Sequence, residues 1–140
     1  IDERNKDTLY SQYPKLKDIK HILASPKMSK IHEYYSEAYL TFVPTIWSEG
    51  TSLSAIESIM SGCPVIVSDV GGLSNIVIDG FNGYVLPPTI KAFKEKTKEI
   101  IANPALRDKL KENCIIMRES FGLKKWKTEI TKIIRSVLER

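Results

Sequence analysis

The chain alternates short apolar runs with longer segments in which apolar residues recur every three or four positions. The short runs are rich in β-favouring residues and predict strands at residues 19–25, 39–44, 64–70 and 84–86. The segments between them have helical spacing and predict helices at residues 28–38, 52–61 and 73–78. This alternation predicts an α/β fold with a parallel, Rossmann-like sheet and helices on both of its faces.

Two of the predicted strands, residues 39–44 and 64–70, are short and mainly apolar and are expected to be buried. The helix between them is predicted from Leu53, Ile56 and Met60, which fall at helical spacing. Gly62 follows it in the position where a glycine commonly ends a helix.

From Ile90 to the carboxyl terminus the pattern is helical, which predicts a helical tail. One of its helices begins at Pro104, with Asn103 as the expected cap. Gly122 separates that helix from a last one, whose apolar stripe consists of Trp126, Ile130, Ile133, Ile134, Val137 and Leu138. Residues 1–18 are polar without a steady period and are expected to be a poorly defined lead-in, in which there is room for a short helix.

The composition fits one compact domain over residues 1–140, with 42% apolar and 27% charged residues. The first residue is Ile1 rather than methionine, so we expect a fragment of a longer protein. The formal net charge of +4 indicates a lysine-rich surface, or attraction to phosphate groups or an anionic membrane. No arginine-rich run or nucleic-acid-binding motif is present, so we expect no nucleic-acid partner.

Cysteine and histidine are too scarce and too scattered to predict a metal site. Cys63 and Cys114 lie in apolar contexts and are expected to be buried free thiols, and there are two histidines. His32, on a predicted helix, is expected at the surface or partly buried. No apolar run approaches the length of a membrane span and no signal peptide is visible, so we expect a cytoplasmic location, with the membrane surface as an alternative.

Ligands of open parallel sheets bind beyond the carboxyl ends of the strands, where two loops, residues 45–51 and 69–72, are expected to lie. In the first, Gly50 allows unusual backbone angles or a close ligand approach. Thr51 and Ser52 suit a helix cap, and the free amides and dipole of a helix start favour phosphate.

Two carboxylates flank this helix start. Glu49 stands just before the helix and Glu57 lies within it, so they are expected to reach opposite ends of a diphosphate ligand. A structural interpretation stays open beside this one. Ser54 and Glu57 have capping-box spacing, so Glu57 can be a cap partner and Glu49 a solvated loop residue.

Residues 20–88 resemble the second half of the carboxyl-terminal domain in the large EX7E family of retaining glycosyltransferases with the GT-B fold. The matching motifs, in chain order, are Phe42-Val-Pro-Thr45, Glu49 with Glu57, Gly62-Cys-Pro-Val65, Asp69-Val-Gly-Gly72 and Asp79-Gly-Phe-Asn-Gly-Tyr-Val85. The resemblance implies a hexosyltransferase that binds a nucleoside-diphosphate sugar donor and serves polysaccharide or glycoconjugate biosynthesis. It implies no metal and no cofactor.

The resemblance also implies roles for individual residues. Glu49 would be the catalytic-site carboxylate at the sugar hydroxyls, and Glu57 would accept hydrogen bonds from the ribose. The remaining expected binding residues would hold the other parts of the donor. The diphosphate would be held by Gly50, Thr51, Ser52 and Leu53, and the base would be contacted by Lys27 and Met28. Many relatives have an aromatic residue and glycine in place of Thr51 and Ser52, which affects the expected shape of the sugar pocket.

Parts of the family's active site have no counterpart in this chain. The first strand of the domain, its Gly-rich turn and its basic pair are not found before Ile19, and neither is the amino-terminal domain that would bind a sugar or lipid-linked acceptor. We therefore expect the isolated chain to be inactive in transfer. Alternatives are a non-catalytic α/β nucleotide-binding or interaction domain, a nucleotide-sugar epimerase of related fold, and a peripheral membrane protein.

Overall fold

The computed structural model describes residues 5–18 and 30–139, and the chain divides into two compact units, Ile1–Ile31 and His32–Arg140. In the first unit, α1 (Lys6–Gln12) is followed by η2 (Pro14–Asp18), and neither has a buried residue. The Lys6 and Lys17 ammonium groups lie 5.9 and 5.8 Å from the centre of the Tyr10 ring. The predicted strand at residues 19–25 lies outside the described residues, as does the expected start of the next helix.

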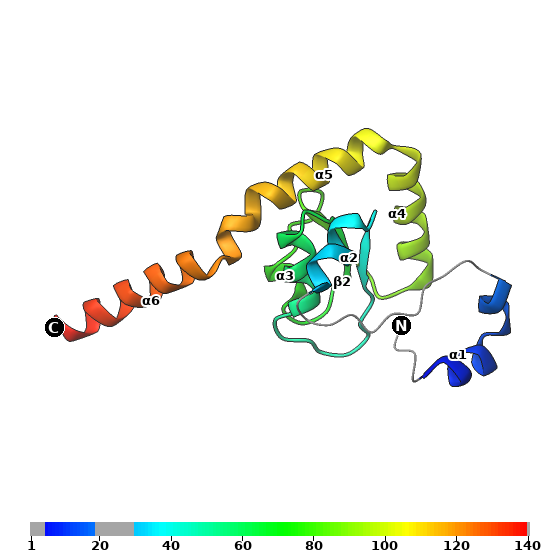
Figure 1. The fold of residues 1–140 in the computed structure, drawn as a ribbon, viewed down its shortest axis with the longest axis horizontal. Helices are drawn as coiled ribbons and strands as arrows, with labels where there is room; N and C mark the ends of the chain where they lie inside the picture. The colour runs from blue at the N-terminus through cyan, green and yellow to red at the C-terminus, as the bar shows by residue number, and fades with distance from the viewer. Residues whose placement is uncertain (1–4, 19–29, 140) are drawn as a thin grey trace. The chain divides into compact units, whose positions relative to one another are not determined.

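The second unit contains the alternating strands and helices that the sequence predicts (Figure 1). Its elements are α2 (Ile31–Glu37, which starts one residue before the unit boundary), β1 (Thr41–Val43), α3 (Leu53–Met60), β2 (Val65–Ser68), η4 (Leu73–Asn75), β3 (Gly83–Leu86), α4 (Ile90–Ala102), α5 (Pro104–Met117), η5 (Arg118–Phe121) and α6 (Leu123–Leu138).

The three strands form one parallel sheet in the order β1-β2-β3. Phe42 of β1 pairs with Ile66 of β2, which in turn pairs with Tyr84 of β3. All four residues of β2 are buried, as expected for the middle strand of a covered parallel sheet. The α/β class and the parallel sheet are thereby confirmed.

Helices cover both faces of this sheet, because alternate residues of β2 face different cores. Val65 and Val67 belong to a core built largely with α3 and η4, whereas Ile66 packs with Ile100 of α4. Helix α5 contributes to both cores, through Cys114 on one face and Leu110 on the other.

Two predicted faces differ from the structure. Phe42 is 45% exposed, because β1 is the edge strand of the described sheet and pairs only with β2. In α3, Leu53 is 68% exposed, and the face toward the sheet consists of Ala55, Ser58 and Ile59. The small side chains bring the helix close to the strand, and the Ser58 hydroxyl donates a hydrogen bond of 2.9 Å to the Cys63 carbonyl.

Several local predictions are confirmed. Asn103 caps α5 by accepting a hydrogen bond of 3.1 Å from the Leu106 amide, with Pro104 in the first turn. Cys63 and Cys114 are buried free thiols, and burial raises the pKa of Cys114 to about 12. His32 is exposed.

The turn at residues 79–83 is built around a buried asparagine, whose backbone carbonyl ties the turn to α5. Asn82 is fully buried; its Oδ1 accepts from the Ile78 amide at 2.7 Å and its Nδ2 donates to the Ile76 carbonyl at 3.2 Å. The Cys114 thiol donates to the Asn82 carbonyl at 3.2 Å. The Asp79-Gly-Phe-Asn-Gly motif therefore has a structural role that its sequence alone did not indicate.

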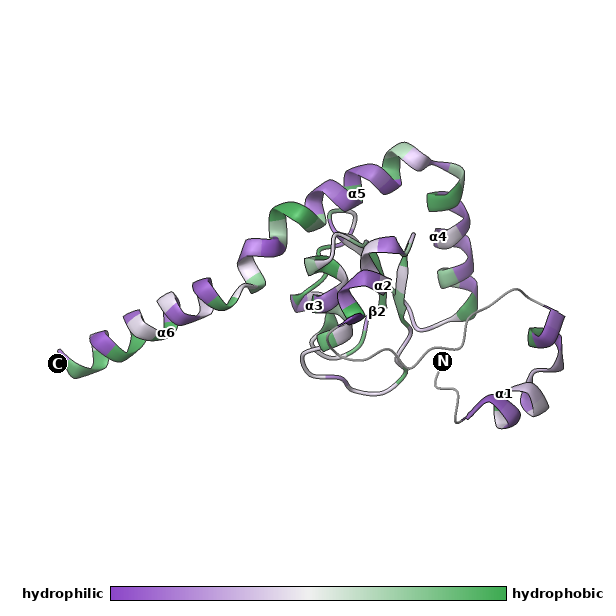
Figure 2. Cartoon of the chain, viewed as in Figure 1, coloured by the Kyte–Doolittle hydropathy of each residue, from purple (hydrophilic) through white to green (hydrophobic). Residues whose placement is uncertain are grey.

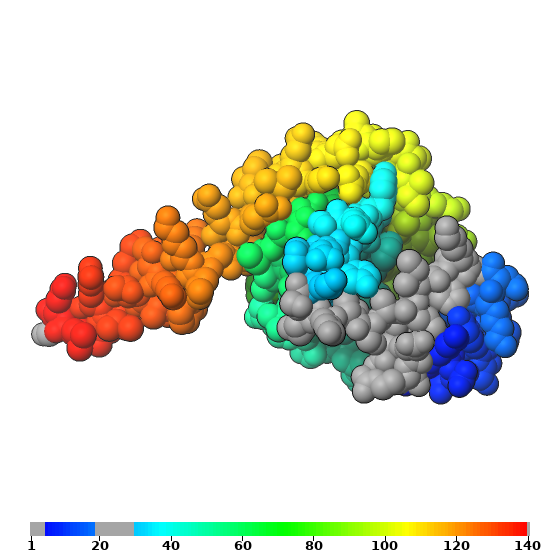
Figure 3. Space-filling model, viewed as in Figure 1, coloured from blue at the N-terminus to red at the C-terminus, as the bar shows by residue number. Residues whose placement is uncertain are grey.

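The last helix, α6, has no buried residue and begins at Leu123, directly after Gly122, as predicted. Its apolar stripe runs along one side and its polar residues along the other (Figure 2). In the space-filling view its side chains stand clear of the helices around the sheet (Figure 3). Within residues 5–18 and 30–139, no helix combines the length and the apolar character that crossing a membrane requires.

Candidate functional site

The loop after β1 and the turn after β2 meet at the carboxyl edge of the sheet. The strands are parallel neighbours, so their carboxyl ends lie together. The Gly72 amide donates a hydrogen bond of 2.8 Å to the Glu49 carbonyl. This bond joins the Gly-Gly turn directly to the peptide of the expected sugar-site glutamate.

The contact between these two segments is backbone against backbone. Gly71 has a φ of +59°, and a Cβ atom there would overlap the Glu49 carbonyl oxygen and lie 2.8 Å from the Glu49 nitrogen. A Cβ on Gly72 would lie 2.6 Å from the Gly50 carbonyl oxygen. The sequence predicted a tight turn at Gly71 and Gly72 but not this contact. Side chains at either position would separate the two segments.

Ser52 is the cap of α3, one of the two residues that the sequence suggested. Its hydroxyl accepts a hydrogen bond of 3.4 Å from the Ala55 amide, and its carbonyl accepts one of 3.2 Å from the Ile56 amide. Helix geometry leaves the amides of Leu53 and Ser54 without an acceptor inside the helix. The Ser52 side chain is 3% exposed and used for capping, so backbone amides are what this helix start offers an anion.

The alternative interpretation of Ser54 and Glu57 as a capping box is wrong. Because Ser52 is the cap, Ser54 already lies inside α3, one turn before Glu57. Glu57 and Glu49 are both partly buried. Across residues 5–18 and 30–139, neither carboxylate takes part in a side-chain hydrogen bond or an ion pair.

The remaining expected binding residues differ in how the structure places them. Gly50 and Thr51 are exposed beside the start of α3, and Leu53 is exposed at its first turn. Gly50 does not have a positive φ, so the expected unusual backbone angle is wrong, but a Cβ there would meet open space. Lys27 and Met28 lie outside the described residues.

A tyrosine that the sequence assigned only to a helix face lies beside Glu57. The pKa of Tyr35 is raised, chiefly by burial. A hydrogen bond with Ser54 acts in the opposite direction, and the negative charge of Glu57 adds to the rise. Tyr35 is on α2 whereas Ser54 and Glu57 are on α3. The same side of α3 that carries Glu57 therefore faces α2.

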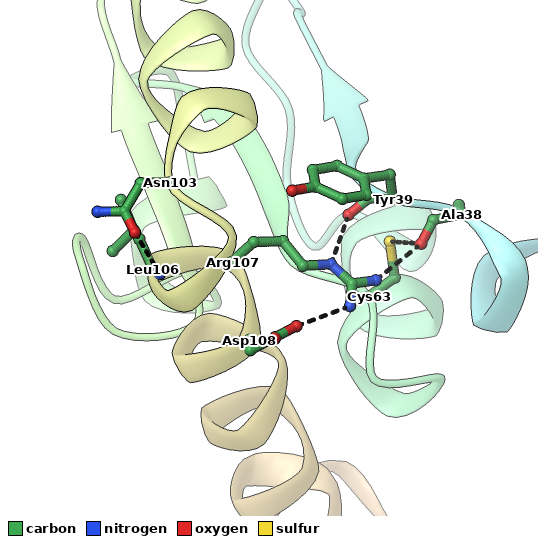
Figure 4. A network of polar contacts seen from close by, with 7 residues as sticks. All are labelled: Ala38, Tyr39, Cys63, Asn103, Leu106, Arg107 and Asp108. Atoms are coloured by element: carbon green, nitrogen blue, oxygen red, sulfur yellow. Dashed lines mark hydrogen bonds and ion pairs between the residues drawn. The ribbon is translucent and has the colours of Figure 1, made fainter.

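The connection from α2 to β1 is fixed by Arg107 of α5 (Figure 4). Its Nε and Nη2 donate hydrogen bonds, both of 3.4 Å, to the carbonyls of Tyr39 and Ala38, and its guanidinium lies 4.9 Å from the centre of the Tyr39 ring. The Cys63 thiol also donates to the Ala38 carbonyl, at 3.5 Å. This network anchors the end of α2, and nothing in the sequence pattern signalled it.

Metal-binding groups do not gather in the part of the chain that the structure describes. No cluster of three or more histidine, cysteine, aspartate or glutamate side chains there has a geometry that would hold an ion.

Comparisons with known sequences give one consistent result. A sequence profile of the family described as glycosyl transferases group 1 matches residues 2–116. A glycosyltransferase of Methanocaldococcus jannaschii is 32% identical over 113 residues, 80% of this chain and 32% of that protein. A D-inositol 3-phosphate glycosyltransferase of Nocardiopsis dassonvillei is 34% identical over 94 residues, 66% of this chain and 22% of that protein. The chain thus spans about a third or less of the length of these relatives.

Solved structures share the fold. Sucrose-phosphate synthase from Thermosynechococcus elongatus superposes with a TM-score of 0.79 at 26% identity, over 97% of this chain and 34% of that one. A glycosyltransferase from Rickettsia africae has a TM-score of 0.82 at 17% identity, over 98% of this chain and 37% of that one. Anabaena HepE in complex with UDP has a TM-score of 0.80 at 15% identity, over 95% of this chain and 36% of that one.

Proposed function

The chain belongs to the glycosyl transferases group 1 family and forms part of the carboxyl-terminal domain of a GT-B fold, and from this we propose that it binds the nucleoside-diphosphate sugar donor of a retaining glycosyltransferase. The arrangement around the start of α3 carries the proposal. The Glu49 peptide is fixed by Gly72, the first helix amides are available, and the carboxylates of Glu49 and Glu57 have no protein partner in the described part of the chain. HepE, a protein of the same fold, binds UDP and UDP-glucose, which supports a donor of this class.

In the proposed complex each end of the donor meets a different group. The Glu49 carboxylate orients the sugar hydroxyls, and the Glu57 carboxylate accepts hydrogen bonds from the ribose. The backbone from Gly50 to Leu53 holds the diphosphate, with the Ser52 side chain keeping the helix start in shape, and Lys27 and Met28 contact the base.

The proposed reaction moves a hexose from the donor to an acceptor hydroxyl with retention at the anomeric carbon. Negative charge grows on the leaving diphosphate, and preorganised amides at the start of α3 stabilise it electrostatically. No residue here is assigned as a nucleophile. The acceptor is bound by another part of a longer protein. Relatives named as poly(glycerol-phosphate) and lipopolysaccharide glycosyltransferases support a role in polysaccharide or glycoconjugate synthesis. The cytoplasmic location expected from the sequence stays a prediction.

Replacing Glu57 with alanine is expected to weaken UDP binding by roughly tenfold to a hundredfold, as for the loss of hydrogen bonds to a charged group. Titration calorimetry of the 140-residue chain with UDP and with 2′-deoxy-UDP measures this effect. The wild-type chain should prefer UDP, and Glu57→Ala should lose most of that preference. Glu95→Ala, which removes an exposed carboxylate from α4, is the matched control. Equal affinities for wild type and Glu57→Ala would refute the ribose assignment.

We further propose that α6 attaches the protein to an anionic membrane surface. Trp126, Ile133 and Val137 on its stripe are 59%, 58% and 64% exposed. Its polar residues include five cations, Lys124, Lys125, Lys127, Lys132 and Arg135, against a single carboxylate, Glu129. An amphipathic helix with a tryptophan and a basic polar face suits the headgroup region of anionic lipids.

Cosedimentation with vesicles tests the membrane proposal. The chain should pellet with phosphatidylglycerol vesicles and stay in the supernatant with pure phosphatidylcholine. Lys125→Ala should reduce binding about fivefold, since each basic residue near the surface contributes about 1 kcal/mol, and Trp126→Ser should reduce it further. Lys98→Ala, on α4, should have no effect. If the chain stays in solution with both lipids, the membrane proposal is wrong.

A further inference from the structure

We propose that the Gly71-Gly72 turn is a positioning element for the donor sugar, because it sets where the Glu49 peptide lies. This inference rests on the proposed function, in which Glu49 faces the sugar. In this proposal the turn does not contact the donor itself. The turn acts through Glu49, and its effect is confined to the sugar end of the ligand.

The turn and the Glu49 peptide occupy adjoining space without a gap. The Gly72 amide donates to the Glu49 carbonyl at 2.8 Å. A Cβ on Gly71 would overlap that carbonyl oxygen, and one on Gly72 would approach the Gly50 carbonyl oxygen to 2.6 Å. Any side chain at these positions must move one of the two segments.

The turn itself cannot move away from the Glu49 peptide, because both of its ends are anchored. On its amino-terminal side the Asp69 amide donates to the Leu86 carbonyl of β3 at 2.7 Å, directly after the buried Ser68. On its carboxyl-terminal side Leu73 is fully buried in the core, and its carbonyl accepts from the Val77 amide at 3.0 Å. Both ends of the turn are therefore anchored in the sheet and the core.

The Glu49 segment is the part that would be displaced by a side chain on the turn. Ile46 and Trp47 are 68% and 78% exposed, and the Thr45 hydroxyl donates to the Trp47 carbonyl of its own loop at 3.2 Å. Glu57 is different, because it lies in α3, which is held to the sheet by the buried Ala55 and Ile59. A side chain on the turn should displace Glu49 and leave Glu57 in place.

The expected signature is a selective loss at the sugar end. Gly71→Ala should weaken binding of UDP-glucose by about tenfold or more relative to UDP, because small displacements of positioning groups have effects of this size. Its affinity for UDP alone should stay within about twofold of wild type, since the Glu57 contact is kept. Glu49→Ala should give the same change in the ratio of the two affinities.

Gly80→Ala is the matched control. Gly80 has a φ of +71°, close to that of Gly71, but a Cβ there meets nothing within 4 Å. Both variants put alanine in the left-handed region, so they share the backbone cost and differ only in the collision with Glu49. Gly80→Ala should keep the wild-type ratio of UDP-glucose to UDP affinity.

The experiment is calorimetry of the 140-residue chain with UDP and UDP-glucose, with circular dichroism to check folding. If Gly71→Ala does not fold, Gly72→Ala replaces it, because Gly72 lacks a positive φ and collides with the neighbouring Gly50 carbonyl. A wild-type chain that binds neither ligand overturns the proposed function and the inference with it. A wild-type chain that binds, with a ratio unchanged in the turn variants or both affinities equally weakened, overturns the inference alone.

Discussion

Replacing Gly83 with alanine is expected to destabilise the sheet unit by about 3 kcal/mol or more, the upper range for forcing extra volume into a packed site. Gly83 is the first residue of β3 and pairs with Val65 of the central strand. A Cβ there would overlap the Val65 carbonyl oxygen and lie 3.0 Å from the Val77 side chain. Neither neighbour has room to move, since both are fully buried. Urea denaturation of the chain, followed by circular dichroism, measures the loss.

Gly50→Ala is the control for Gly83→Ala. Gly50 does not have a positive φ, and a Cβ there meets nothing within 4 Å, so its replacement should change the free energy of unfolding by less than about 0.5 kcal/mol. Equal denaturation midpoints for Gly83→Ala and wild type would show that β3 adjusts without cost, contrary to the packing described.

Replacing Ile59 with alanine should cost about 2–5 kcal/mol, the range for truncating a large buried aliphatic side chain. Ile59 is fully buried on the inner face of α3 and packs in the core with Val65 and Val67 of the central strand. Its loss leaves a cavity between helix and sheet that the surrounding strands cannot close completely. The change is measured as a lower urea midpoint with an unchanged denaturant slope.

The matched comparison is Leu53→Ala on the same helix. Leu53 is 68% exposed, so its truncation should change stability by no more than about 0.5 kcal/mol. The two substitutions remove aliphatic groups of equal size from an exposed and a buried position of α3. Similar losses from both variants would contradict the orientation of α3 given by the structure.

The sequence predicted the elements of the second unit well wherever the signal is local. Asn103 and Pro104 predicted a helix start correctly, because both act within the first turn of the helix. Asn103 caps a first-turn amide, and proline suits a position whose amide has no acceptor inside the helix. The all-apolar run around Ile66 marked a buried strand because both faces of a covered sheet exclude water.

The orientation of α3 could not be read from its apolar spacing. Leu53 is more apolar than Ser58, yet Ser58 is buried, because its hydroxyl finds the Cys63 carbonyl and its small size allows close packing. A polar residue that is satisfied by a partner only the fold supplies does not reveal its burial in the sequence.

The sequence predicted which residues belong to the candidate site but not the contacts among them. Ser52 and Glu57 were named from spacing and resemblance, and the structure decided that Ser52, rather than Ser54, caps the helix. The contact of Gly71 with Glu49 joins residues 22 positions apart and depends on the pairing of β1 with β2. Such contacts require the sheet order, which the sequence pattern did not determine.

Helix α5 reaches both sides of the sheet, with Leu110 in one core and Cys114 in the other. Separation of this helix from the strands would open both cores at once, so neither layer can melt while the other stays intact. Loss of order in the sheet and the helices that cover it is therefore expected to be all-or-none, and protection of the β2 amides against hydrogen exchange should report global unfolding rather than local opening.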